Sequence, residues 1–141
     1  MSESYDKTKH LEFIQQAISR MAHNSFMCKG WAITLFAALE AINGDKWQFL
    51  IYAIPEFVAL LAFWYLDAYY LSLERLFREL YEDVRTHDFT ADPYSMKTGV
   101  CGIGKTLKAM LSISEFLLYL TLIIFISWRL YYDRDTTPGF L

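Results

Sequence analysis

The chain has 141 residues, which is enough for a single domain. Its residues are 55% hydrophobic and 18% aromatic, and an aromatic share this large is unusual in a soluble domain. The net charge of −3 excludes a global positive field for duplex nucleic acid, and the two cysteines, in no paired motif, argue against a disulfide framework.

Residues 1–26 predict an N-terminal amphipathic helix that lies in the cytosol. One apolar stripe recurs at steps of three and four residues: Leu11, Ile14, Ile18 and Met21. A stripe of this kind docks on a partner helix or lies on a membrane surface.

Residues 27–66 predict a transmembrane hairpin. Its first span covers 27–42, with Lys29 snorkelling at the start, and its second span covers 47–66. The turn signal Asn43-Gly44-Asp45 lies between the two spans, so we expect them to be antiparallel.

Residues 67–109 predict a cytosolic extension of the second helix, followed by a basic loop. An apolar seam continues along the helix through Leu66, Tyr69, Leu73, Leu76, Leu80 and Val84. This seam must bury against the N-terminal helix, another subunit or both. An aspartate–proline pair and three glycines then predict irregular structure over 86–105.

Residues 110–130 predict a third transmembrane helix, and 131–141 form a tail. Every predicted span is interrupted by polar residues, so a soluble helical bundle is the competing interpretation. Tryptophans near the span ends favour the membrane, because aromatic belts form at the lipid–water boundary: Trp31, Trp47, Trp64 and Trp128. The predicted fold is therefore all-α, a multi-pass helical membrane protein of about three transmembrane helices with amphipathic cytosolic helices.

Basic residues predict the orientation of the chain in the membrane. Lysine and arginine are concentrated before the first span and between the second and third spans, whereas the short turn and the tail carry few. The positive-inside rule therefore places the N-terminus and the long middle segment in the cytosol.

Three carboxylates lie inside the predicted spans: Glu40, Glu56 and Glu115. An acid in lipid is costly, so such acids face a bundle interior, a partner chain or a water-filled path. With the predicted orientation they lie at different depths, where a ring of subunits would turn each into a ring of carboxylates that selects cations. These are the candidate pore-lining residues; the alternative is that each is protonated or hydrogen-bonded within the protein.

Residues 99–106 (GVCGIGKT) match the P-loop pattern G-x-x-x-x-G-K-[ST]. A P-loop needs a preceding strand and a parallel sheet with an acid for magnesium, and neither fits this chain. A basic, glycine-rich loop without acids over 93–114 instead predicts an anion-binding patch, with a flexible linker as the alternative. The candidate ligand-binding residues lie in this region and on the helix before it: Lys97, Lys105, Lys108, Arg75, Arg78 and Arg85.

No pattern predicts an enzyme, a metal site or a cofactor. His10, His23 and His87 lie in polar stretches without metal-ligand spacing, so we expect each to be solvated. The sequence shows no Ser–His–Asp, Cys–His or paired-acid arrangement.

Two sequence blocks resemble a known family. They are HLEFIQQAISRMAHNSFMCKGW at 10–31 and WYLDAYYLSLERLFRELY at 64–81. Both resemble the RipA-like octameric membrane proteins of the bacterial inner membrane. The resemblance implies a homo-oligomeric, multi-pass protein of the cytoplasmic membrane, in contact with membrane lipid.

The chain also looks like the small membrane effectors of anti-phage systems, of which the Hailong-type channel is an example. That likeness implies a channel or pore controlled by a nucleotide or short oligonucleotide that a partner nucleotidyltransferase makes. We therefore expect an oligomeric effector gated through its cytosolic part, with a non-conducting membrane scaffold as the alternative.

Overall fold

The described residues form four helices and no strand. The computed structural model describes residues 6–43, 49–87 and 94–136. Within them lie α1 (Lys7–Asn43), α2 (Phe49–Thr86), α3 (Ile103–Met110) and α4 (Ile113–Thr136). The predicted turn after Asn43, the aspartate–proline pair and the end of the tail lie outside the described residues.

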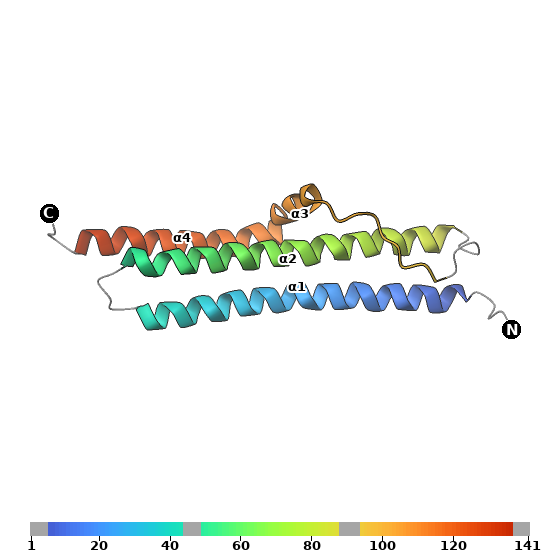
Figure 1. Ribbon diagram of the computed structural model, residues 1–141, viewed down its shortest axis with the longest axis horizontal. Helices are drawn as coiled ribbons and strands as arrows, with labels where there is room; N and C mark the ends of the chain where they lie inside the picture. Colours follow the sequence, from blue (N-terminus) through green and yellow to red (C-terminus); the bar gives the residue numbers. More distant parts are fainter. Residues whose placement is uncertain (1–5, 44–48, 88–93, 137–141) are drawn as a thin grey trace.

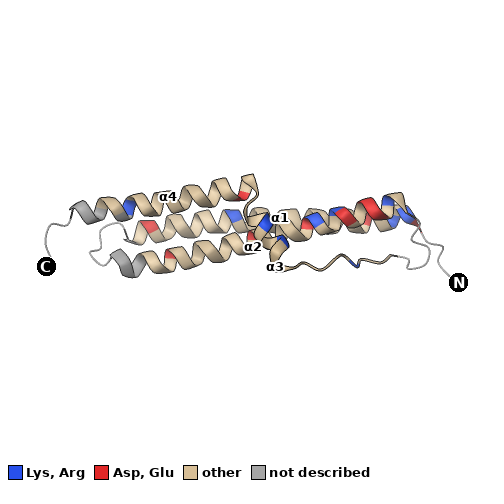
Figure 2. Cartoon of the chain, turned by 90° about the horizontal axis from the view of Figure 1, so that it is seen from above, with Lys and Arg blue, Asp and Glu red and all other residues tan. Residues whose placement is uncertain are grey.

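The molecule is long and thin, and its two halves differ in composition. Helices α1 and α2 run antiparallel along its whole length, and α4 lies beside one half of them (Figure 1). We call the half with α4 the membrane half (29–43, 49–67 and 113–136) and the other half the stalk (7–28 and 68–86). Charged residues gather on the stalk, whereas the membrane half carries few (Figure 2).

The helices confirm the all-α membrane fold. Helices α1 and α2 are each long and apolar enough to cross a membrane. Helices α3 and α4 together make a third candidate span, bent by 68° at the break between them. The third span was expected from residue 110, but its straight part begins at Ile113, because Leu111 and Ser112 interrupt the helix.

The first helix differs from the predicted division at residue 26. The cytosolic segment and the first span form one helix, α1, without a break. Its one internal glycine, Gly30, stays helical and has open space around the position of a Cβ. Similarly, α2 continues through Pro55, which lies in its second turn. Each of these helices therefore links the stalk directly to the membrane half.

The stalk is held together by an apolar core between α1 and α2. Ile14 and Ile18 pack there against Leu80 and Val84. The part of the predicted seam at Leu80 and Val84 is thus buried on the N-terminal helix, as one of the expected alternatives had it. Leu66 and Tyr69 are exceptions because Asp67 and Ala68 take the inward positions of that turn.

The membrane half has its own core and an apolar outer surface. Ala32, Leu60, Tyr119 and Ile126 are buried between the three helices. Trp31 and Trp128 are exposed, as an aromatic belt requires. Trp64 is instead partly buried, because its ring stacks on Tyr119 at 5.5 Å and its Nε1 donates to the Met110 carbonyl.

Candidate functional site

Charged side chains from all three helices meet at the junction between the stalk and the membrane half. The Lys29 ammonium on α1 lies 2.8 Å from Asp67 Oδ1 on α2 and 2.7 Å from Glu115 Oε1 on α4. Together with Ser25 and Tyr119 these residues make what we call the inner cluster. Lys29 was expected to snorkel outward, but it points inward because two carboxylates face it from the other helices.

Asp67 accepts more hydrogen bonds than Glu115, the other carboxyl group of the inner cluster. It is fully buried, and three donors reach it. The Ser25 hydroxyl and the Lys29 ammonium donate to Oδ1 at 2.5 Å and 2.8 Å, and the Tyr119 hydroxyl donates to Oδ2 at 3.2 Å. Hydrogen bonds from several donors replace the water that a buried carboxylate loses.

Glu115 is less completely satisfied. Its side chain is 1% exposed, and Oε1 meets Lys29 and, at 3.3 Å, the Ser114 hydroxyl. Its other oxygen, Oε2, is buried without a hydrogen-bond partner among the described residues. The inner cluster thus sets two carboxyl groups against one ammonium group, so it is not balanced in formal charge.

A second charged group, the outer cluster, lies further along the membrane half. The Arg129 guanidinium on α4 forms an ion pair with Glu40 on α1, and its Nη1 lies 3.8 Å from Glu56 Oε1 on α2. Glu56 is buried, and Glu40 and Arg129 are partly buried. The outer cluster again takes one residue from each of the three helices.

Helix geometry separates the clusters by about half a bilayer. Lys29 and Glu40 are eleven residues apart on α1, which corresponds to about 16 Å at the helical rise per residue. The hydrocarbon core of a bilayer is about 30 Å thick, so both clusters fit within or at the edge of it. The three transmembrane helices are therefore joined by charge at two levels.

The structure corrects the expected depths of the three acids. Glu40 and Glu56 were expected at different depths, but both reach Arg129 and so share one level. The antiparallel hairpin is the reason, since it places the end of α1 beside the start of α2. Glu115 lies at the other level, with Lys29. Pore lining by these acids stays a prediction.

Two basic members of the clusters were missed by sequence reasoning. Lys29 was expected only to snorkel at the start of the first span, and Arg129, at the end of the third predicted span, was given no partner. Sequence reasoning could have identified both residues. An acid buried in lipid requires a partner, and Lys29 and Arg129 are the basic residues nearest to the span interiors. Asp67, the other carboxylate partner of Lys29, also accepts a hydrogen bond from the Tyr119 hydroxyl.

The arginines proposed for ligand binding are engaged by neighbours. Arg78 pairs with Glu74 at 2.6 Å, and Arg85 pairs with Glu82 at 2.7 Å. Arg75 donates to the Ser112 hydroxyl at 3.1 Å, and so ties α2 to the break between α3 and α4.

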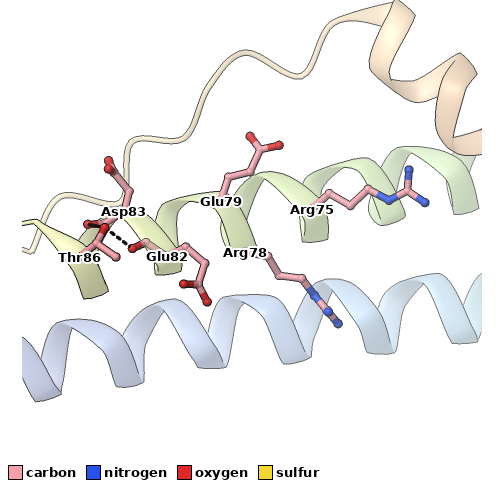
Figure 3. Close-up of a pocket in the computed structure, with 6 residues that line it drawn as sticks. All are labelled: Arg75, Arg78, Glu79, Glu82, Asp83 and Thr86. Atoms are coloured by element: carbon pink, nitrogen blue, oxygen red, sulfur yellow. Dashed lines mark hydrogen bonds between the residues drawn. The ribbon is translucent and has the colours of Figure 1, made fainter.

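A groove of about 540 Å³ runs along the stalk face of α2 (Figure 3). Its lining contains two arginines, three acids and one threonine: Arg75, Arg78, Glu79, Glu82, Asp83 and Thr86. Arg78 and Glu82 point toward the side of α1, whereas Glu79 and Asp83 point to the opposite side. Mixed charges of this kind do not favour a polyanion over a second charged helix.

The lysine candidates do not converge on one site. Lys97 lines a shallow hollow beside Glu79 and Asp83 of α2. Lys105 and Lys108 lie on α3, where both are exposed. The six basic candidates are therefore spread over the stalk, the irregular segment 94–102 and α3.

The P-loop match lacks the structure that a P-loop needs. Residues 94–102 are irregular, and α3 begins only at Ile103. The backbone N–H groups of Lys105 and Thr106 both donate to the Gly102 carbonyl, so they do not point at a phosphate. Thr106 is buried. The segment thus matches the P-loop sequence pattern but lacks the backbone geometry that binds phosphate.

The histidines show one departure from the expectation of solvation. His10 is buried, because residues 94 and 95 cover it and its Nε2 lies 2.9 Å from the Ser95 carbonyl oxygen. His23 and His87 are exposed as expected. Within residues 6–43, 49–87 and 94–136, no group of acids, histidines and cysteines has the arrangement of a metal site.

The comparisons with known proteins found no match to a protein-family model, a curated protein or a solved structure.

Proposed function

We propose that this chain is one subunit of an oligomeric membrane effector that conducts ions when its charged clusters separate. The observation that carries the proposal is that Glu40, Glu56 and Glu115 are each paired with a cation on another helix. Ion pairs of this kind are expensive to bury and mark ion paths and switches in membrane proteins. In the conformation described here each of these acids is engaged by a cation, and we assign this conformation to the closed state.

Release of the outer cluster would expose two carboxylates. Arg129 is shared between Glu40 and Glu56, so its departure would remove the cation that both acids share. Repeated around a ring of subunits, they would attract cations and repel anions. The path would then be cation-selective, and its selectivity filter would lie at the level of the outer cluster in the membrane.

Ion flux from liposomes tests this mechanism. We expect Arg129→Gln to raise cation flux, because it frees the two acids, and Glu56→Gln to lower the flux of the active protein. Glu12→Gln, which removes an exposed stalk charge, is the matched control. The double variant Glu40→Gln/Arg129→Gln keeps the net charge of the parent protein. It therefore separates an effect of charge on conduction from an effect of misfolding. Equal flux from all four variants would refute the channel.

We propose that a soluble anionic ligand, a nucleotide or short oligonucleotide from a partner nucleotidyltransferase, acts on the stalk. The support is the resemblance to nucleotide-controlled effectors, together with the continuity of α1 and α2 from the stalk into the membrane half. A ligand shifts an equilibrium only if it binds one state better than the other. Nucleotides should therefore change both flux and the protection of stalk amides; a change in neither argues against such a ligand.

The proposed location is the inner membrane of a bacterium, with the N-terminus and stalk in the cytosol and with neighbouring copies of the chain beside it. The positive-inside rule and the resemblance support this arrangement. Native mass spectrometry in detergent measures the subunit number directly. A monomer under all mild detergents would remove the ring on which selectivity depends.

A non-conducting membrane scaffold is the second candidate. It is favoured by the inner cluster, where the Lys29 ammonium is engaged by two acids and the surrounding side chains are buried. In this case acid-to-amide variants leave flux at the background level, whereas disruption of the α1–α2 core in the stalk abolishes recovery of the partner protein.

A further inference from the structure

Helix α3 has three faces of different chemistry. Thr106 and Ala109 are buried against α2. Ile103 and Leu107, one turn apart, share a second face, and Lys105 and Lys108 lie on a third. Only the first of these faces is covered by the described part of the chain.

The apolar face of α3 belongs to a longer exposed stripe. The stripe begins before the helix and continues past it, and every member is more than half exposed: Val100, Ile103, Leu107, Leu111 and Ile113. Beyond Ile113 the exposed surface continues as Phe116 and Leu117 of α4. The stripe is therefore continuous with the lipid-facing surface of the third span.

Hydrogen bonds fix the level of α3 along the molecule. Trp64 donates to the Met110 carbonyl, and Arg75 donates to the Ser112 hydroxyl. These donors lie on either side of Asp67, so the end of α3 is held at the level of the inner cluster. Figure 1 shows α3 beside the junction of the stalk and the membrane half.

We propose that α3 is an interfacial helix that rests on the anionic phosphate headgroups of the leaflet next to the stalk. The apolar stripe inserts at the boundary between headgroups and acyl chains, and Lys105 and Lys108 contact lipid phosphates. An apolar stripe beside a basic face is the pattern of helices that lie in a membrane surface. The absence of acids over 93–114 leaves these lysines without a competing carboxylate in their own segment.

Depth-dependent quenching tests the insertion of the stripe. The full chain, with Cys28→Ser and Cys101→Ser, carries a fluorophore on Leu107→Cys in nanodiscs of phosphatidylcholine and phosphatidylglycerol. We expect lipids that are spin-labelled near the headgroup to quench the fluorescence of this probe, and we expect aqueous iodide not to quench it. A probe at Gln16→Cys on the stalk is the water-exposed control, and one at Ile124→Cys on α4 is the deep control.

Two outcomes of this measurement would overturn the proposal. Iodide quenching at Leu107 equal to that at Gln16 would place the stripe in water. Protection from both quenchers, together with a disulfide between copies when unlabelled Leu107→Cys is treated with a thiol oxidant, would assign the stripe to a second copy of the chain.

The lysines are tested by lipid preference. We expect Lys105→Gln/Lys108→Gln to lower the ratio of bound phosphatidylglycerol to phosphatidylcholine at least about fivefold, since each lysine near an anionic surface contributes appreciably. Lys9→Gln/Arg20→Gln removes the same charge from the exposed stalk and should leave the ratio unchanged. An equal fall in both variants would refute a role for α3.

Competition separates lipid phosphate from free phosphate compounds. Millimolar ATP and a short oligonucleotide, added to the same nanodiscs, should leave the quenching and the lipid ratio of the parent protein unchanged. Displacement of lipid by either compound would instead assign Lys105 and Lys108 to a soluble ligand. Ion flux plays no part in these measurements, so they stand or fall separately from the channel.

Discussion

At the scale of single residues, Lys29 has the largest consequence for stability. It is the one cation of the inner cluster, and it pairs with two buried carboxyl groups from different helices. Removing one member of a buried ion pair leaves an uncompensated charge, which costs more than the pair contributes when complete. The three helices of the membrane half therefore depend on this side chain for their contact near the stalk.

We expect Lys29→Met to lower the free energy of unfolding in mixed micelles by about 3–5 kcal/mol. The measurement is a denaturant titration followed by Trp64 fluorescence, because this ring stacks on Tyr119 within the bundle. Arg20→Met, exposed on the same helix, should change stability little. Adding Glu115→Gln to Lys29→Met should restore part of the loss; a double variant as unstable as the single one would argue against charge imbalance as the cause.

The three acids were recognisable from the sequence as residues that need partners, but their partners were not. Which cation meets which acid depends on the rotation and level of each helix, and a single sequence contains neither. Glu40 and Glu56 show this, because they are sixteen residues apart in the chain yet meet the same guanidinium. Arg129 is their partner because α4 packs beside the hairpin of α1 and α2.

At the scale of elements, periodicity predicted the stalk well. Steps of three and four residues identified Ile14 and Ile18 on α1 and Leu80 and Val84 on α2, and these four side chains form one core. Periodicity could not show that the N-terminal segment and the first span are one helix, because a change from amphipathic to apolar composition looks like a boundary. The break before Ile113 was also missed, since Leu111 and Ser112 carry no strong turn signal.

We expect Ile14→Ala to destabilise the stalk by about 2–5 kcal/mol, because it leaves a cavity in a core made of few side chains. Hydrogen exchange should speed up at the amides of 7–24 and 76–86, while amides in the membrane half keep their protection. Gln16→Ala, exposed on the next turn, is the control. Loss of protection over the whole chain would show instead that the stalk and the membrane half unfold together.

At the scale of the whole molecule, composition and the positions of the apolar and aromatic residues predicted the class of the protein. The apolar spans, the tryptophans at their ends and the short connection between the first two helices led to a multi-pass helical fold, which the long apolar helices confirm. The number of subunits and the identity of a ligand do not follow from composition and sequence pattern, because both depend on the surfaces of other molecules. The likeness to octameric membrane proteins therefore stays a prediction about this chain.

The predicted orientation can be measured with a membrane-impermeant maleimide on cells and on inverted vesicles. In a background without native cysteines, we expect Thr8→Cys to react only in inverted vesicles and Tyr131→Cys only in cells whose outer membrane is permeable. Both positions are exposed, so burial does not limit the reaction. The opposite pattern would reverse the topology and would place the stalk outside the cytosol.

The two charged clusters also restrict how the helices can move. Sliding α1, α2 or α4 by a single turn, about 5.4 Å, would separate it from its partners at both levels at once, because each cluster takes one residue from each of these three helices. Tilting is less costly, since one cluster can serve as a pivot while the other opens. A force on the far end of the stalk would therefore spread the helices around Lys29 and part them at Arg129, and piston motion is the least accessible movement for this bundle.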